Sequence, residues 1–254
     1  MMGGHHAISG AAAWVAVTAA APFTLGLNPL PASSVLLGAV VTAGAALLPD
    51  LDHRSATIAR SGGMVTWGVS TAASVTSGGH RHGLHSLLAV VGFTFGTTLA
   101  GRWEAVVPVF GLIPAGSALL LLALVAFSTR ALDITRGGDV VLWLSAAVAV
   151  VVVLAVAPEQ LEWLPTSVMI GVVVHLLGDL ITTGGIPLLW PWMPRPPRAV
   201  SRIPGMRKVW RSGGYLALPV LGNAGSKREW VLCAGLSVYA LYGLAASAGV
   251  LGAP

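Results

Sequence analysis

Long apolar runs alternate with short polar segments along almost the whole chain. A straight transmembrane helix needs about 20 residues, and seven runs reach or approach that length. These runs are residues 9–27, 33–48, 87–100, 105–127, 140–157, 167–180 and 231–251. The second, third and sixth are short, so we expect the polar residues at their ends to lie slightly inside the membrane interface.

Two further segments depart from this pattern. Residues 61–77 are mildly apolar but rich in Ser, Thr and Gly, and we interpret them as an interfacial or re-entrant helix. Residues 191–219 are rich in proline and basic residues, which disfavours helix and predicts a loop. The pattern therefore predicts an all-α polytopic membrane protein with about seven transmembrane helices. We expect one membrane domain, 1–254, with a basic loop at about 191–230.

The composition supports a membrane protein. Hydrophobic residues make up 55% of the chain and charged residues 9%, whereas soluble domains carry about 25% charged residues. The first run has no basic region before it and is not typical of a cleavable signal peptide. The only cysteine, Cys233, excludes a disulfide within the chain. A basic cytoplasmic face and contact with membrane lipids explain the net charge of +5, so we expect no direct nucleic-acid binding.

The distribution of basic residues predicts an orientation. Seven helices that cross alternately from a cytoplasmic N-terminus place the loops at 49–86, 128–139 and 181–230 on one side. Lys and Arg are retained in the cytoplasm during insertion, so that side should be cytoplasmic. The opposite side carries only Arg102. The cytoplasmic set is Arg54, Arg60, Arg81, Arg130, Arg136, Arg195, Arg198, Arg202, Arg207, Lys208, Arg211, Lys227 and Arg228. We therefore expect a multi-pass protein of the plasma (inner) membrane.

The same threading brings all the histidines to the cytoplasmic side. Each histidine lies in a polar segment at or near the end of an apolar run, and two of these segments also contain aspartates. Imidazole and carboxylate together are the ligands that proteins use for zinc, manganese or iron. We hypothesise that separate segments converge on one metal site. The residues concerned are His5, His6, Asp50, Asp52, His53, His80, His82, His85, His175 and Asp179.

The spacing within two of these segments suits shared binding. His175 and Asp179 are four residues apart in a helical context and project from one face. A buried hydrogen bond between helices would explain that pair equally well. Asp50 and Asp52 follow a proline, and in an extended turn both would point the same way and approach one ion or bridge two. The alternative is a helix cap in a solvated turn, which explains one aspartate but not both.

The central segment, residues 79–86, contains three histidines within six positions. His80 and His85 bracket a glycine turn, and Ser86 is placed to cap the following helix. Arg81 could bind a phosphate or carboxylate through two hydrogen bonds, or anchor the chain to lipid headgroups. His82 suits a surface position or indirect support of a ligand better than direct binding.

Four blocks in order along the chain resemble the YdjM-like family of LexA-binding, inner-membrane metal-dependent hydrolases. Leu84 departs from the family pattern, which has threonine there. The resemblance to zinc-dependent phospholipase C and single-strand nucleases, which are helical multi-zinc phosphodiesterases, is more distant. The blocks are His6-Ala7-Ile8-Ser9-Gly10, Leu47-Leu48-Pro49-Asp50-Leu51-Asp52-His53, His80-Arg81-x-x-x-His85-Ser86-Leu87 and His175-x-x-x-Asp179-x-x-Thr182, which runs on to Pro191.

The residues and the resemblance together predict a metal-dependent hydrolase. We expect a phosphoester substrate at the inner leaflet, such as a phospholipid or lipid-linked phosphate, with Arg81 and Asp52 as catalytic residues. The metal would be divalent, zinc or alternatively manganese, and the excess of ligands suggests two or three ions. His53, Ser86 and Thr182 would support the ligands. The expected metal ligands are His6, Asp50, Asp52, His80, His85, His175 and Asp179.

Other classes of protein fit the same features. A metal-ion transporter would need ligands near the membrane midplane, whereas these cluster at one interface. A non-catalytic, partner-binding membrane protein with a structural metal is the other alternative. An intramembrane metalloprotease is disfavoured because the sequence has no H-E-x-x-H motif.

Overall fold

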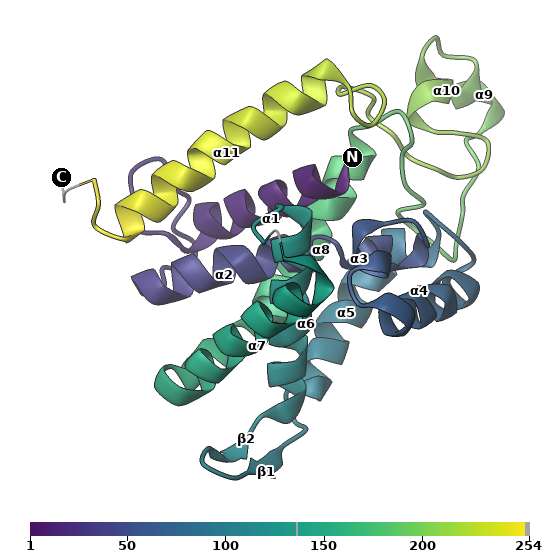
Figure 1. Ribbon diagram of the computed structural model, residues 1–254. Helices are drawn as coiled ribbons and strands as arrows, with labels where there is room; N and C mark the ends of the chain where they lie inside the picture. The colour runs from purple at the N-terminus through teal and green to yellow at the C-terminus, as the bar shows by residue number, and fades with distance from the viewer. Residues whose placement is uncertain (136, 252–254) are drawn as a thin grey trace.

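The computed structural model is a bundle of helices and describes residues 1–135 and 137–251 (Figure 1). Arg136 and Pro254 lie outside these residues. The longer helices are α1 (Gly3–Thr18), α2 (Ala32–Ala45), α4 (Gly63–Ser77), α5 (Leu87–Ala100), α6 (Ala115–Ala131), α7 (Gly138–Val156), α8 (Leu164–Leu180) and α11 (Lys227–Ser247). Short helices are η1 (Leu48–Asp52), α3 (Thr57–Arg60), η2 (Gly83–His85), η3 (Pro158–Leu161), α9 (Arg198–Ser201) and α10 (Met206–Val209).

Helices α1, α2 and α8 form the centre of the bundle. Helix α1 packs against α2, α8 and α11, while α2 also packs against α6 and α8. Close approach of α2 and α8 depends on Gly171, where a Cβ atom would lie 2.7 Å from Ala45 Cβ and from the Ala46 nitrogen. Figure 1 shows α11 lying along α1 at one side of the bundle and α7 at another.

The prediction of one apolar helix over residues 105–127 is wrong in its first part. Residues Ala105–Val107 (β1) and Gly111–Ile113 (β2) pair as an antiparallel hairpin, and α6 begins only at Ala115. Pro108 and Pro114 explain the change, because proline removes a backbone donor and clashes within a helix. The hairpin projects beyond the ends of α5 and α6 (Figure 1).

The two segments outside the apolar pattern are both partly helical. Residues 63–77 form the single helix α4, which packs against η1. The basic segment 191–219, expected to be a loop, contains the one-turn helices α9 and α10. This segment and the two short helices protrude beyond the end of α8 (Figure 1).

Four helical segments of the described chain are long and apolar enough to cross a membrane. They are Ala32–Asp52, Gly138–Val156, Pro158–Leu180 and Lys227–Ser247. The apolar helices α5 and α6 are shorter than these. Helix α7 exposes Val140, Leu144 and Val148 at 61–72%, and an exposed apolar stripe of this kind is typical of a surface that contacts lipid. The chain is therefore a helical membrane protein.

Candidate metal centre

Four chain segments meet at one end of the bundle. They are the start of α1, the end of α2 with η1, the turn η2 before α5, and the end of α8. These segments supply His6, Asp50 and Asp52, His85, and His175 and Asp179 respectively. All of these side chains except Asp50 are buried at 1% exposure or less. The structure thus brings residues that span 174 positions of the sequence, from His6 to Asp179, into one buried cluster.

Two imidazole nitrogens of this cluster each lie within 4 Å of two carboxylate oxygens. The two imidazole nitrogens His85 Nε2 and His175 Nε2 are 3.2 Å apart. Asp50 Oδ1 lies 3.8 and 3.9 Å from them, and Asp179 Oδ2 lies 3.7 and 3.9 Å from them. Ligand atoms at about 2.0–2.2 Å from a tetrahedral ion are separated by about 3.3–3.6 Å. Asp50, His85 and His175 offer atoms within 4.8 Å of one another and so form one candidate set for a divalent ion. Asp179 Oδ2 is near enough to both imidazoles to be a fourth donor, and the four residues are hereafter the His85–His175–Asp50–Asp179 quartet.

Hydrogen bonds orient both imidazoles of the quartet. His175 Nδ1 is 2.7 Å from the Ala46 carbonyl oxygen, and His85 Nδ1 is 3.2 Å from Asp52 Oδ2. Since a carbonyl and a carboxylate are acceptors, each Nδ1 carries the proton and donates it. Nε2 of each ring is then the atom left to bind a metal, which is the usual arrangement of histidine ligands in proteins. At His85 the metal would take the place of a proton on Nε2, because the raised pKa of this side chain keeps it protonated without a metal.

Asp52 lies beside the quartet, and the extended turn predicted for Asp50 and Asp52 is wrong. Residues 48–52 form the 3-10 helix η1 instead of an extended turn, so residues two apart point in different directions. Asp50 faces the quartet, whereas Asp52 accepts hydrogen bonds from His80 Nδ1 at 3.0 Å and the Arg81 nitrogen at 3.2 Å. Asp52, His80 and His85 still offer atoms within 4.8 Å of one another. Both Asp52 oxygens accept hydrogen bonds, through which Asp52 orients His80 and His85 in this structure.

His6 lies against a ring of the quartet. Its ring stacks on that of His175, with centroids 3.7 Å apart, and its Nε2 lies 3.4 Å from Asp179 Oδ1. Lone pairs of nearly parallel rings do not converge, so His6 and His175 are poorly arranged to share one ion. Asp179 Oδ1 also contacts the Met1 nitrogen, and its Oδ2 contacts Arg81 Nη2, so ions bridged by Asp179 would compete with these two groups. His6, His175 and Asp179 offer atoms within 4.8 Å of one another.

The remaining histidines lie around the quartet. The His80 side chain is 38% exposed, and its ring contacts that of His53 at a centroid distance of 4.3 Å. His53 also hydrogen-bonds Ser55 at 3.0 Å. His82 lies away from the cluster, 3.4 Å from the Tyr215 hydroxyl. His5 pairs at 2.5 Å with Glu229 on α11, so only one histidine of the His5–His6 pair reaches the centre.

Arg81 reaches the centre from a strained turn. Its backbone φ is +58°, and its Nη2 lies 3.2 Å from Asp179 Oδ2. The guanidinium occupies the space over Gly184, where a Cβ atom would be 1.5 Å from Nη1. The Tyr215 hydroxyl donates to the Arg81 carbonyl oxygen at 3.1 Å. Burial raises the pKa of Tyr215, so this hydroxyl remains a donor at neutral pH.

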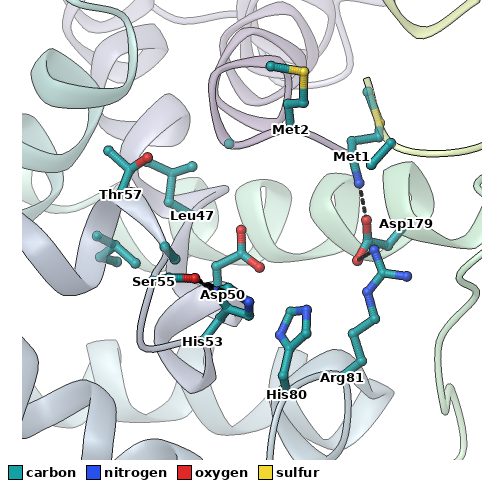
Figure 2. A pocket seen from close by; sticks show the side chains of 14 residues that line it. Met1, Met2, Leu47, Asp50, His53, Ser55, Thr57, His80, Arg81 and Asp179 are labelled. Carbon is teal, nitrogen blue, oxygen red and sulfur yellow. Dashed lines mark hydrogen bonds and ion pairs between the residues drawn. The ribbon is translucent and has the colours of Figure 1, made fainter. Parts of the chain in front are cut away.

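A cavity of about 430 Å³ opens beside the quartet. Asp50, Asp179, Arg81 and His80 line its polar side, and Figure 2 shows the Arg81 and His80 side chains extending toward the two aspartates. Its opposite wall is apolar and includes Leu47. The Met1 nitrogen contacts Asp179 Oδ1 in the same cavity (Figure 2). A small substrate with an anionic group and an apolar group would find matching surfaces here.

Two of the expected supporting residues act on the backbone. Thr182 donates its hydroxyl to the Asp179 carbonyl oxygen at 2.8 Å, which fixes the end of α8. Ser86 is the N-cap of α5, as its position predicts, and accepts from the Ala89 nitrogen at 3.4 Å. Each therefore stabilises a helix end that carries or adjoins a quartet residue.

The electrostatics of the centre favour a bound cation. Burial opposes the charged form of His85, but the nearby Asp50 and Asp52 carboxylates outweigh it and raise the pKa to about 9. At His53, burial is the largest cause that lowers the pKa, and the nearby His80 lowers it further. The carboxylates therefore stabilise positive charge at the position of His85, and a metal ion would supply such charge.

The sequence interpretation missed Glu229. This carboxylate is fully buried and accepts hydrogen bonds from the nitrogens of Met2 at 2.8 Å and Gly225 at 2.9 Å, besides its pairing with His5. It thereby ties the start of α1 to the start of α11. One signal was present, because Glu229 is an isolated acid between basic residues and an apolar run.

Fold and site define a helical membrane protein with a buried cluster of histidines and aspartates at one end of its bundle. The chain belongs to the YdjM inner membrane protein family, whose model matches residues 1–250. The resemblance inferred from the four sequence blocks is thereby confirmed. No curated protein and no solved structure matches the chain.

Proposed function

We propose that this protein is a metal-dependent hydrolase of the inner membrane that cleaves a phosphoester of a lipid or other membrane-associated substrate. The observation that carries the proposal is the set of Asp50, His85 and His175 atoms within 4.8 Å of one another, beside a cavity that Arg81 lines. Asp179 Oδ2, 3.7 Å from His85 Nε2, adds a fourth donor to this quartet. His85, His175, Asp50 and Asp179 would hold a divalent metal, zinc or alternatively manganese, which when bound would supply activation of water and stabilisation of charge on phosphoryl oxygens. His6 with Asp179 would hold a second ion.

The residues of the chain would divide the remaining work. Asp52 and the Ala46 carbonyl hold the two quartet imidazoles in the tautomer that leaves Nε2 free. Arg81 would bind a phosphoryl oxygen and stabilise the charge that develops on it, because its guanidinium faces both the cavity and Asp179. The apolar wall of the cavity excludes water from one side of the substrate.

The membrane topology belongs to the same proposal. A multi-pass chain of about seven crossings with a cytoplasmic N-terminus places the quartet at the inner leaflet. The uneven distribution of Lys and Arg supports this orientation. Reporter fusions in the loop around Arg202 should therefore report the cytoplasm. A periplasmic signal there would contradict the orientation and the inner-leaflet substrate.

The experiment compares metal content with hydrolysis in purified protein. The wild type should bind zinc or manganese stoichiometrically and cleave phosphoesters, while Asp179→Ala and His85→Ala should lose both properties. Gly184→Ala should retain the metal but lose most turnover, because its methyl group displaces the Arg81 guanidinium. Gly68→Ala is the matched control, since a Cβ there meets nothing within 4 Å. Stoichiometric metal without cleavage of any phosphoester would refute the proposal.

One observation favours a second function, a structural metal in a partner-binding protein. The quartet alone can complete a tetrahedron, and closed sites of four protein ligands are structural. In that case chelation would unfold the protein, and no substitution at Arg81 or Gly184 would change a measurable activity. A metal-ion transporter is the less supported alternative, because the quartet lies at one end of the bundle and not midway along its helices.

A further inference from the structure

A second cavity lies between α1, α8 and α11. Its volume is about 290 Å³, and its lining is almost entirely apolar. Each helix contributes residues at helical spacing to this cavity, so one face of each helix is involved. Helix α1 contributes Ser9, Ala12, Ala13 and Ala16, and α11 contributes Leu232, Leu236 and Tyr239. Helix α8 contributes Val174, Leu177 and Gly178, and Ile181 follows just after its end.

Small side chains on α1 create this space. Helix α1 packs against both α8 and α11, and its face toward the cavity carries only alanines and one serine. The Ser9 hydroxyl is turned toward its own helix and donates to the His5 carbonyl oxygen at 2.8 Å. The cavity consequently offers few polar partners. A hydrocarbon chain fits it better than a polar ligand does.

The apolar cavity adjoins the candidate metal centre. Met1 lines both cavities, so the apolar space and the space beside Asp179 and Arg81 adjoin this residue. Gly178 lies in the apolar cavity and immediately precedes Asp179 in sequence. A Cβ atom at Gly178 would lie 2.6 Å from the Met1 sulfur and 3.2 Å from His6 Cε1. An unbranched and flexible Met1 side chain can shift to join the two spaces.

We propose that the cavity between α1, α8 and α11, hereafter the acyl groove, binds the hydrocarbon chain of a lipid phosphate whose phosphate lies beside Arg81. Hydrolysis of the bound lipid phosphate rests on the proposed function, whereas binding of its hydrocarbon chain does not. Because both cavities are lined by Met1, we infer one occupant for both, a molecule with an anionic head and an apolar tail. The transmembrane helices α8 and α11 place the groove where lipid chains are present.

Binding should depend on the chain of the substrate. For phosphates that bind from water, each methylene buried in the groove contributes about fourfold in affinity, so a longer chain should bind better than a shorter chain with the same head group. Ala16→Phe places a ring within the groove and away from the quartet. Ala234→Phe is the matched control, since Ala234 is exposed and lies on α11 two residues from Leu232 and Leu236, on a different face.

The first arm of the test measures binding without activity. Phosphatidic acid with a diazirine at the end of one acyl chain is added to full-length protein in phosphatidylcholine nanodiscs, and labelled peptides are mapped. Labelling should fall on the lining residues of the groove and be displaced by excess phosphatidic acid but not by excess phosphatidylcholine. Ala16→Phe should reduce the displaceable labelling about 10-fold, and Ala234→Phe should leave it unchanged. Equal labelling of wild type and Ala16→Phe, or labelling that excess phosphatidic acid fails to displace, would overturn the proposal.

The second arm compares hydrolysis of long-chain and water-soluble phosphoesters. Ala16→Phe should lower kcat/KM for the long-chain substrate about 10-fold and leave that for the soluble substrate unchanged. If displaceable labelling is present but neither substrate is cleaved, the acyl groove stands and the hydrolase proposal falls. If both substrates are cleaved and Ala16→Phe affects them equally, the groove proposal falls and the hydrolase proposal stands.

Discussion

Asp52→Asn offers a sharp test of how the centre is built. Asp52 is fully buried and accepts hydrogen bonds from His85 Nδ1 at 3.2 Å, His80 Nδ1 at 3.0 Å and the Arg81 nitrogen at 3.2 Å. Asparagine keeps one acceptor oxygen but turns an NH₂ group toward at least one of these donors. The substitution therefore removes an orienting bond and changes no atom of the His85–His175–Asp50–Asp179 quartet.

The expected magnitude follows from the role of Asp52 as an orienting partner. Loss of a carboxylate that orients a histidine ligand weakens metal binding by about 10–100-fold, which corresponds to about 1.4–2.7 kcal/mol. Asp52→Asn should thus bind the same number of ions more weakly. Asp179→Asn should lose stoichiometric binding, because Asp179 supplies a quartet oxygen. The control is Asp139→Asn, which alters an exposed carboxylate paired with Arg130 at 3.4 Å.

Titration of zinc against a competing chelator in purified protein measures these affinities directly. The reasoning predicts an intermediate affinity for Asp52→Asn, between those of the Asp139→Asn control and Asp179→Asn. Complete loss of binding in Asp52→Asn would show that Asp52 is itself a ligand. An affinity equal to the control would show that the hydrogen bond to His85 does not orient it. Either result would refute the assignment drawn from the distances.

Three further predictions concern the stability of the centre. Gly171→Leu should lower stability by about 1–3 kcal/mol and reduce metal content, because the leucine side chain would push α8 away from Ala46. Thermal unfolding and metal analysis would check this, with Gly92→Leu as the control at a site that has free space. Glu229→Gln should cost about 1–3 kcal/mol, since it weakens a buried acceptor of three hydrogen bonds, whereas exposed Glu104→Gln should change the Tm little. Chelation should lower the Tm of the wild type, and added zinc should restore it; an unchanged Tm would argue against a bound metal.

The convergence of the polar segments could be inferred from the sequence by counting membrane crossings. Alternating helices place the start of the first, the end of the second and the end of the sixth apolar run on one side. The structure brings His6, Asp50 and His175 together at one end of the bundle in the same way. Hydropathy and charge carry this information because they report which helix ends share a side. They say nothing about rotation of each helix around its axis.

Finer features depended on backbone geometry that the patterns did not resolve. The spacing of Asp50 and Asp52 suited an extended turn, but η1 points the two carboxylates at different partners. The apolar character of residues 105–113 masked Pro108, Gly111 and Pro114, which together make a hairpin. In both cases the backbone conformation of a short local segment differed from the one that the sequence pattern predicted.

The arrangement of the centre also depends on groups that have no side-chain signature. The Ala46 carbonyl orients His175, and it comes within 2.7 Å because Gly171 lets α8 approach α2. Gly184 likewise leaves the space in which the Arg81 guanidinium reaches Asp179. A glycine at these positions matters through the atoms it lacks, so no list of histidines and acids reveals it. The two residues nevertheless decide whether donors far apart in sequence reach one point in space.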